Sequence, residues 1–201
     1  MAEETKMRRL LEFVERHGVV HARDLKSLGV PREYLRRLCD RGVLVRTGRG
    51  LYLTPRAADT AHLDLAQVAK AIPNAVICLV SALQFHEIGT QIPHDVWLAL
   101  DRRAARPAVT YPPVRIVRFS GKALTEGVQQ HDIVGVRVNV YGPAKTVADC
   151  FKYRNKVGLD VALEALRDVR RTRRCTNDEL WTYAEICRVT NVMRPYMEVI
   201  G

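Results

Sequence analysis

The sequence predicts an α+β protein in which an N-terminal winged helix-turn-helix is followed by a larger α+β domain with a mainly antiparallel sheet flanked by helices. Three observations carry this prediction. Apolar residues recur at helical spacing before residue 42, two apolar segments joined by a glycine-containing turn follow, and β-rich segments lie between helical stretches farther along. We place the domains at 1–57 and 58–201.

The first domain is expected to contain three short helices and a hairpin. Met7, Leu10, Leu11 and Val14 form the apolar stripe of a first helix, which Gly18 ends. The segments HARDLKSLGV and PREYLRRLCDR predict a second and a third helix, with glycine as a stop signal and proline suited to a first helical position. The segment VLVRTGRGLYLT predicts two strands around a turn. This combination is typical of a winged helix-turn-helix.

The second domain follows a connector, PRAADTAHL, and begins with two mostly apolar helices expected over 63–72 and 75–88. Strands rich in β-branched and aromatic residues follow, and helical spacing then returns. The expected strands are 96–100, 114–120, 129–134 and 136–142, and the expected helices are 144–154, 158–172, 177–189 and 191–199.

Composition excludes several classes of protein. With 47% hydrophobic and 27% charged residues, the chain has the make-up of a soluble globular protein. No apolar run reaches the roughly 18 residues of a membrane span, and the charged, amphipathic start is not a secretory signal. The five cysteines include no C-x-x-C pair, which argues against a disulfide framework and a zinc site and favours small core residues. We expect a cytoplasmic protein without a membrane partner.

The charge balance points toward a polyanionic partner. The formal net charge is +10 and the pI is about 9.7. Residues 1–60 hold 13 Lys and Arg against 8 Asp and Glu, and residues 101–127 hold 6 against 2. The excess of positive charge is therefore concentrated in the first domain and in later patches.

The third predicted helix and the hairpin turn are rich in arginine. Leu35, Leu38 and Cys39 share the helix face that must meet the first two helices, so the arginines project outward. A helix fits the major groove, where arginine can bind guanine O6 and N7 together, and glycines in the turn let the backbone approach a phosphate. We therefore predict a surface for double-stranded DNA. Its expected members are Arg32, Arg36, Arg37, Arg41, Arg46 and Arg49.

A second group of cations lies on the C-terminal helices. In YGPAKTVADCFKYRNK a proline opens a helix whose Val147, Cys150 and Phe151 face inward, which leaves the basic residues outside. The run RDVRRTRRC adds cations at a helix end, where they complement the helix dipole. These residues either solvate the helices or form a second surface that contacts phosphate. The candidates are Lys145, Lys152, Arg154, Arg170, Arg171, Arg173 and Arg174.

Motifs of catalysis are missing from the sequence. It contains no P-loop, no G-x-G-x-x-G, no H-E-x-x-H and no G-x-S-x-G elbow. Asp95 and Asp101 flank a predicted strand, but metal-assisted phosphodiester cleavage needs clustered carboxylates, and pairing with Arg102 or Arg103 is the simpler interpretation. We expect no enzyme activity, no cofactor and no metal. Two alternatives stay open: a metal-dependent nuclease fused to a winged helix, and a protein-interaction module without DNA binding.

Four segments together resemble the AbiEi family of antitoxins from type IV toxin–antitoxin systems. The first is LGVPREYLRRLCDRGVLVRTGRGLYLTP, which is typical of many winged helices. The others are CLVSALQFHEIGT, IPHDVWLAL and VYGPAKTVADCFKYRNKVG, and their order and separation are more specific. The resemblance spans nearly the whole sequence.

The resemblance implies a transcriptional autorepressor and antitoxin that binds inverted repeats in its own promoter, as a monomer or as a dimer that pairs on DNA. It implies that the winged helix contacts DNA and that a basic surface of the C-terminal domain assists. The functional partner would be a nucleotidyltransferase-like toxin, with no direct contact required.

Overall fold

The computed structural model describes residues 2–48, 50–55, 62–109 and 111–199. Its contacts divide the chain into two compact units, which are described separately below. One unit holds Met1–Pro73, Ala108–Pro112 and His131–Val138, and the other holds Asn74–Pro107, Pro113–Gln130 and Asn139–Gly201. The boundary predicted between residues 57 and 58 lies outside the described residues.

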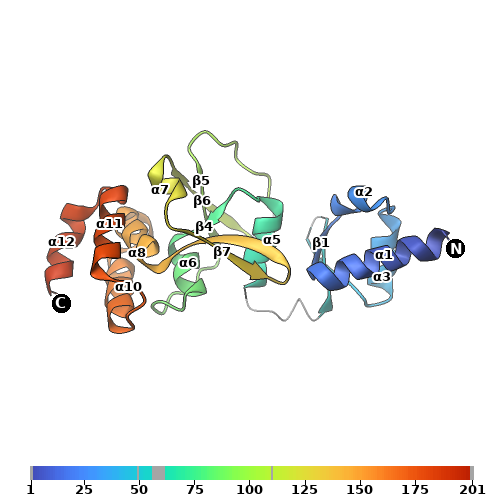
Figure 1. Cartoon of the computed structure of the whole chain (residues 1–201), viewed down its shortest axis with the longest axis horizontal. Helices are drawn as coiled ribbons and strands as arrows, with labels where there is room; N and C mark the ends of the chain where they lie inside the picture. Colours follow the sequence, from blue (N-terminus) through green and yellow to red (C-terminus); the bar gives the residue numbers. More distant parts are fainter. Residues whose placement is uncertain (1, 49, 56–61, 110, 200–201) are drawn as a thin grey trace. The chain divides into compact units, whose positions relative to one another are not determined.

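The N-terminal part contains three helices and a small sheet, coloured blue in Figure 1. The helices are α1 (Ala2–His17), α2 (Asp24–Leu28) and α3 (Glu33–Asp40), and the strands are β1 (Val19–His21), β2 (Val45–Gly48) and β3 (Leu51–Leu53). The strands are antiparallel in the order β1-β3-β2. The predicted helices and hairpin are confirmed, whereas β1 was not predicted. Its three residues are too short for a periodic pattern and pair only with β3, where Val19 lies opposite Leu53.

An apolar cluster packs the three helices together with Val20 of β1. Leu10 and Val14 of α1 pack with Leu35 and Leu38 of α3, and all four side chains are at most 1% exposed. Gly29 ends α2 with φ 64°, and its N–H bonds to carbonyls at the end of that helix, a conformation that costs glycine little. The resulting sharp turn between α2 and α3 sets the direction of α3.

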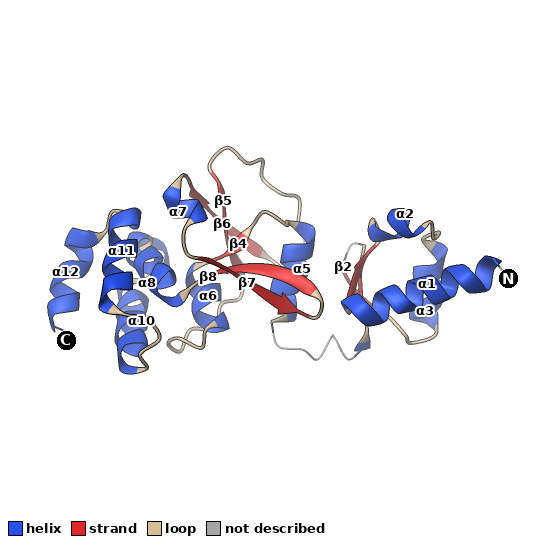
Figure 2. Cartoon of the chain, in the orientation of Figure 1, coloured by secondary structure: helices blue, strands red, loops and turns tan. Residues whose placement is uncertain are grey.

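After residue 62, helices and strands are mixed up to β8, and the elements that follow are helices, as Figure 2 shows. They are α5 (Leu63–Ala71), β4 (Val76–Ile77), α6 (Leu79–Phe85), β5 (Val96–Asp101), β6 (Val114–Phe119), α7 (Lys122–Thr125), β7 (Val128–Ile133), β8 (Val136–Tyr141), α8 (Pro143–Lys152), α9 (Arg154–Val157), α10 (Leu159–Arg171), α11 (Asn177–Cys187) and α12 (Thr190–Val199).

The helix predicted over 75–88 is wrong in its first part. Val76 and Ile77 form β4 instead, and α6 begins only at Leu79. The backbone is extended at Cys78, with φ −143° and ψ 175°, and Leu79 has φ 49°. Val76 and Ile77 form a strand because they pair with β5 on one side and β8 on the other.

The larger sheet has the order β6-β5-β4-β8-β7 and is mixed, so the predicted mainly antiparallel sheet is wrong. β4 pairs antiparallel with β5 but parallel with β8, and β5 pairs parallel with β6 over their full lengths. Val96 lies opposite Val114 because residues 102–113 return the chain to the start of β5. Parallel strands require a long crossover connection of this kind. The sequence of neither strand indicates whether the two will pair parallel or antiparallel.

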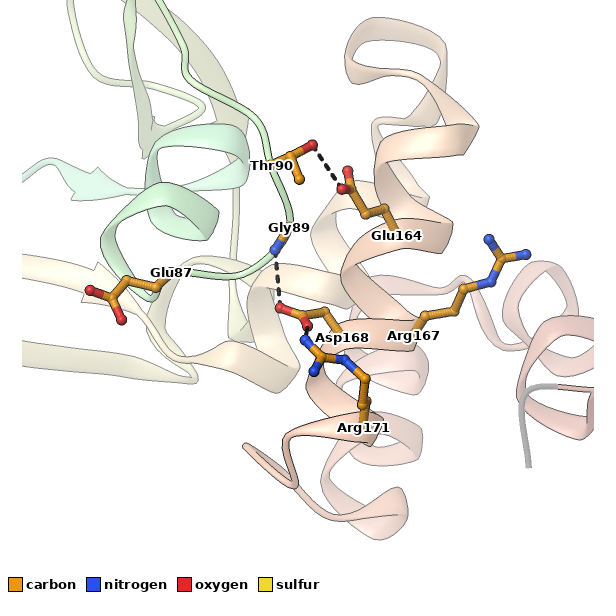
Figure 3. Close-up of a pocket in the computed structure, with 7 residues that line it drawn as sticks. All are labelled: Glu87, Gly89, Thr90, Glu164, Arg167, Asp168 and Arg171. Carbon is orange, nitrogen blue, oxygen red and sulfur yellow. Dashed lines mark hydrogen bonds and ion pairs between the residues drawn. The ribbon is translucent and has the colours of Figure 1, made fainter.

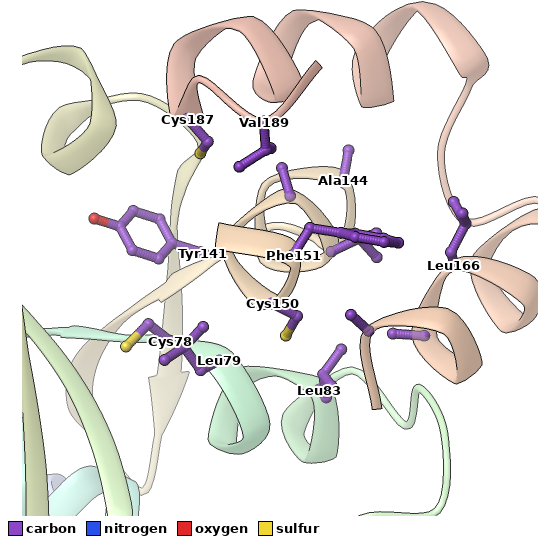
Figure 4. Close-up of a cluster of buried hydrophobic side chains, with 14 of the residues drawn as sticks. Cys78, Leu79, Leu83, Tyr141, Ala144, Cys150, Phe151, Leu166, Cys187 and Val189 are labelled. Atoms are coloured by element: carbon purple, nitrogen blue, oxygen red, sulfur yellow. The ribbon is translucent and has the colours of Figure 1, made fainter. Parts of the chain in front are cut away.

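The helices of the second unit enclose its core. α8 contacts α6, α10 and α11, and its Cys150 and Phe151 are fully buried (Figure 4). Cys78 and Cys187 are buried in the same cluster, as expected for small core residues. Among the helices in the described ranges, none is both long enough and apolar enough to cross a membrane.

Candidate nucleic-acid interface

Helix α3 has one buried and one exposed face. Tyr34, Leu35 and Leu38 are buried against the N-terminal core. Arg36 lies on the other face, and 86% of its side chain is exposed. The apolar residues thus position the helix, and the arginine stays accessible to a partner.

The arginines of α3 are paired with carboxylates of the same helix. An Nη atom of Arg37 lies 2.7 Å from Glu33 Oε1, and Nε of Arg36 lies 4.0 Å from Asp40 Oδ2. Arg37 also lies over the Tyr34 ring, 5.4 Å from its centre. Exposed pairs at i,i+4 are worth only about 0.3–0.5 kcal/mol, so a phosphate or a base edge can replace the carboxylate.

The other arginines predicted to contact DNA flank α3. Arg32 immediately precedes the helix and Arg41 immediately follows it, and both are exposed. Arg46 is exposed on β2, opposite Tyr52 of β3. Arg49 lies outside the described residues. Five of the six predicted residues are therefore on α3, at its ends, or on the following strand.

The turn before α2 is held by a charged cluster in the same unit. Asp24 accepts a hydrogen bond from the N–H of His21 at 3.0 Å and pairs with Lys70 Nζ at 3.0 Å. The N–H of Arg23 donates to His21 Nδ1 at 3.2 Å. Burial, together with the charge of Arg23, lowers the pKa of His21. The imidazole is therefore neutral and serves as an acceptor in this turn.

Lys145 does not belong to a second basic surface, so this prediction is wrong. Its side chain is 0% exposed, and its Nζ lies 2.5 Å from Oδ2 of Asp149, which is equally buried. The ammonium also lies over the Tyr141 ring, 4.0 Å from its centre. The i,i+4 spacing of Lys145 and Asp149 is the signal in the sequence that could have indicated this buried pair.

Most other cations of the predicted second surface bind groups of the protein itself. Arg154 donates to the carbonyl of Phe151 at 3.0 Å, and Arg170 donates to that of Met197 at 2.7 Å. Arg174 lies 3.9 Å from Glu87. Arg173 and Lys152 are exposed. Without Lys145, the second surface therefore stays a prediction, and several of its cations already bind groups of the protein itself.

Arg171 lines a pocket of about 450 Å³ that carries both signs of charge (Figure 3). Asp168 accepts from the N–H of Gly89 at 3.1 Å and pairs with Arg171 at 2.5 Å, while Thr90 donates to Glu164 at 2.8 Å. Although burial opposes the shift, the Gly89 N–H and Arg171 lower the pKa of Asp168. These groups satisfy one another, so the pocket has little capacity to attract a polyanion.

Lys152 lines a second pocket together with Arg118, Lys122 and Arg188, a grouping that the sequence did not predict. These four cations come from separate segments of the chain, so no local pattern links them. Within the described ranges, no group of three His, Cys, Asp or Glu side chains is placed to hold a metal ion.

Comparison with known proteins gives a family for the N-terminal segment. Residues 8–55 match the model of the family described as "Transcriptional regulator, AbiEi antitoxin". The segments of the second domain that resemble this family lie outside the matched residues. No curated protein matches the chain.

A solved structure shares the fold. It is the RV2827C protein from Mycobacterium tuberculosis, at 16% sequence identity and a TM-score of 0.56, with 90% of this chain and 71% of that chain covered.

Proposed function

We propose that the protein is a DNA-binding repressor of its own operon, because residues 8–55 match the family described as "Transcriptional regulator, AbiEi antitoxin". In this proposal the three helices and the β2–β3 hairpin act as a winged helix-turn-helix, and α3 enters the major groove. The observation that carries the proposal is the amphipathic α3, whose buried face fixes the helix and whose exposed face presents Arg36 and Arg37. Arg32, Arg41 and Arg46 would contact phosphates.

We further propose that the protein acts in the cytoplasm as the antitoxin of a type IV system. It would bind inverted repeats of the promoter, as a monomer or as a dimer that pairs on DNA, and exclude polymerase by occupying the site. Its functional partner would be a nucleotidyltransferase-like toxin that it need not touch. No catalytic step is assigned to this chain.

Binding to the protein's own promoter is the direct test. The purified chain is titrated by fluorescence anisotropy against the duplex upstream of its gene and against a scrambled duplex, at two salt concentrations. We expect selective binding whose logarithmic affinity falls with the logarithm of salt by about 0.9 per phosphate contacted. Equal, weak binding to both duplexes would contradict repression and favour a protein-interaction module.

Replacing Arg36 tests whether α3 contacts a base, because this exposed side chain is not part of the buried core. Arg36→Ala is expected to weaken operator binding by about 1–3 kcal/mol if the guanidinium contacts a base. Arg8→Ala is the matched control, since Arg8 is also exposed on a helix and lies 3.7 Å from an i,i+4 partner, Glu12. If the two variants bind the operator with equal affinity, Arg36 and the exposed face of α3 do not contact the operator.

A further inference from the structure

The pocket around Lys152 has the charge of an anion site. It has a volume of about 520 Å³ and lies where β6 ends and α7 begins. Four cationic residues line it, Arg118, Lys122, Lys152 and Arg188, and among the described residues that line it none is Asp or Glu. The side chains of Lys122, Lys152 and Arg188 are exposed, so their charges are available to a ligand that enters from water.

Hydrogen bonds fix the β6 side of this pocket. Nη1 of Arg118 donates to the carbonyls of Asp101, at 2.9 Å, and Ala104, at 2.8 Å. The carbonyl of Arg118 accepts from the Tyr153 hydroxyl at 3.0 Å, which ties β6 to the end of α8. The ammonium of Lys152 lies 5.5 Å from the centre of the Phe119 ring. The wall is therefore formed before any ligand arrives.

The opposite side is anchored to the buried core. Arg188 follows α11 in a left-handed conformation, with φ 59°, and its N–H bonds to the carbonyl of Glu185 at 3.0 Å. Its neighbour Cys187 donates a hydrogen bond from Sγ to Asp149 Oδ1 at 3.1 Å. Arg188 is thus held at a defined place beside Lys152, which reduces the entropy lost when both bind one ligand.

The backbone at Gly121, which also lines the pocket, is exposed. Gly121 has φ 54° and ψ −142°, and a Cβ atom at this position would meet nothing within 4 Å. A ligand can therefore approach the main chain closely here. The Asp101 carboxylate lines an adjoining pocket, where it accepts a hydrogen bond from the N–H of Arg103 at 2.8 Å.

We propose that this pocket binds a small phosphate-bearing anion, specifically a di- or triphosphate group such as that of a nucleotide. Arginine and lysine together provide the forked and point-like donors that phosphate oxygens take up. The volume is in the range of small-molecule sites and exceeds what a single phosphate needs, while four cations match the charge of a polyphosphate better than that of a monoanion. The residues that line this pocket are different from those of the proposed DNA surface on and around α3.

Calorimetric titration of the full chain with tripolyphosphate, ATP and inorganic phosphate tests the proposal. We expect the first two to bind more tightly than inorganic phosphate. Lys152→Ala and Arg188→Ala are each expected to weaken tripolyphosphate binding at least about fivefold, because each removes a charge-assisted hydrogen bond. Lys156→Ala is the control, since Lys156 is an exposed cation outside the pocket lining and should have no effect. Unchanged melting temperatures would show that the variants fold.

Three results would overturn the assignment. One is no heat of binding at millimolar tripolyphosphate, and another is an equal loss in Lys156→Ala, which would mean general charge attraction. The third is that the unaltered chain binds no tripolyphosphate while Lys152→Ala binds duplex DNA more weakly than the unaltered chain does. That result would assign the pocket to the DNA backbone. Because the calorimetric titration contains no DNA, its failure leaves the proposed regulatory function untouched.

Discussion

Replacing Asp149 by alanine is expected to lower the free energy of unfolding by about 3–5 kcal/mol, as for other buried ion pairs that lose one partner. Lys145 and Asp149 are both 0% exposed, so the variant leaves an ammonium without a counter-ion in the core. The Cys187 thiol loses its acceptor as well. Burial raises the pKa of Asp149, and the nearby Lys145 charge opposes that rise. Urea unfolding followed by circular dichroism measures the loss.

A double variant tests whether the stability lost in Asp149→Ala comes from the unpaired charge of Lys145. Lys145→Met combined with Asp149→Leu removes both charges at similar volume and is expected to recover most of the stability lost in Asp149→Ala, because desolvation no longer opposes folding. Glu12→Ala, which breaks an exposed pair with Arg8, should change stability by no more than about 0.5 kcal/mol. A loss below about 1 kcal/mol in Asp149→Ala would mean that Lys145 reaches water or another partner.

Replacing Leu38 by alanine is expected to lower the stability of the N-terminal unit by about 2–5 kcal/mol. Leu38 is 1% exposed and packs with Leu10 and Leu35 in the cluster that holds α3. The variant leaves a cavity where α3 packs against that cluster. Thermal unfolding would show the loss, and operator binding is expected to disappear at the temperature where this unit unfolds.

Arg36→Ala is the matched comparison on the opposite face of α3. It should leave the melting temperature unchanged while weakening operator binding, whereas Leu38→Ala should lower the melting temperature and leave affinity near normal in the cold. A similar melting temperature for Leu38→Ala and the unaltered chain would show that α3 is held by contacts other than this cluster.

Except for β1, the N-terminal elements could be predicted because their signals are local. The apolar stripe of α1, the glycine after α2 and the glycine-containing turn of the hairpin each act within a few residues. The parallel pairs of the larger sheet could not be predicted, because strand direction depends on a crossover and on partners distant in sequence. Val76 and Ile77 form β4 for the same reason.

The candidate sites show a similar contrast. The arginines on and around α3 follow from helical spacing, and the structure places all but Arg49 there. Helical spacing from Val147, Cys150 and Phe151 predicts Lys145 on the surface, but lysine can be fully buried when it is paired, and here Asp149 supplies the pairing. The pocket at Lys152 joins β6, α7, α8 and the end of α11, so its four cations become neighbours only after folding.

The two ion pairs along α3 have a consequence for how many copies of the protein a cell needs. Glu33 and Asp40 balance Arg36 and Arg37, so the helix carries no net formal charge. A duplex of arbitrary sequence therefore gains less attraction from α3 than it would from a helix without these carboxylates, whereas an operator also offers base edges to the two arginines. Non-target DNA greatly outnumbers any operator and sequesters regulators that bind it well. Under the proposed function, this neutral helix keeps a larger share of the molecules unbound, so a few copies suffice to silence the gene.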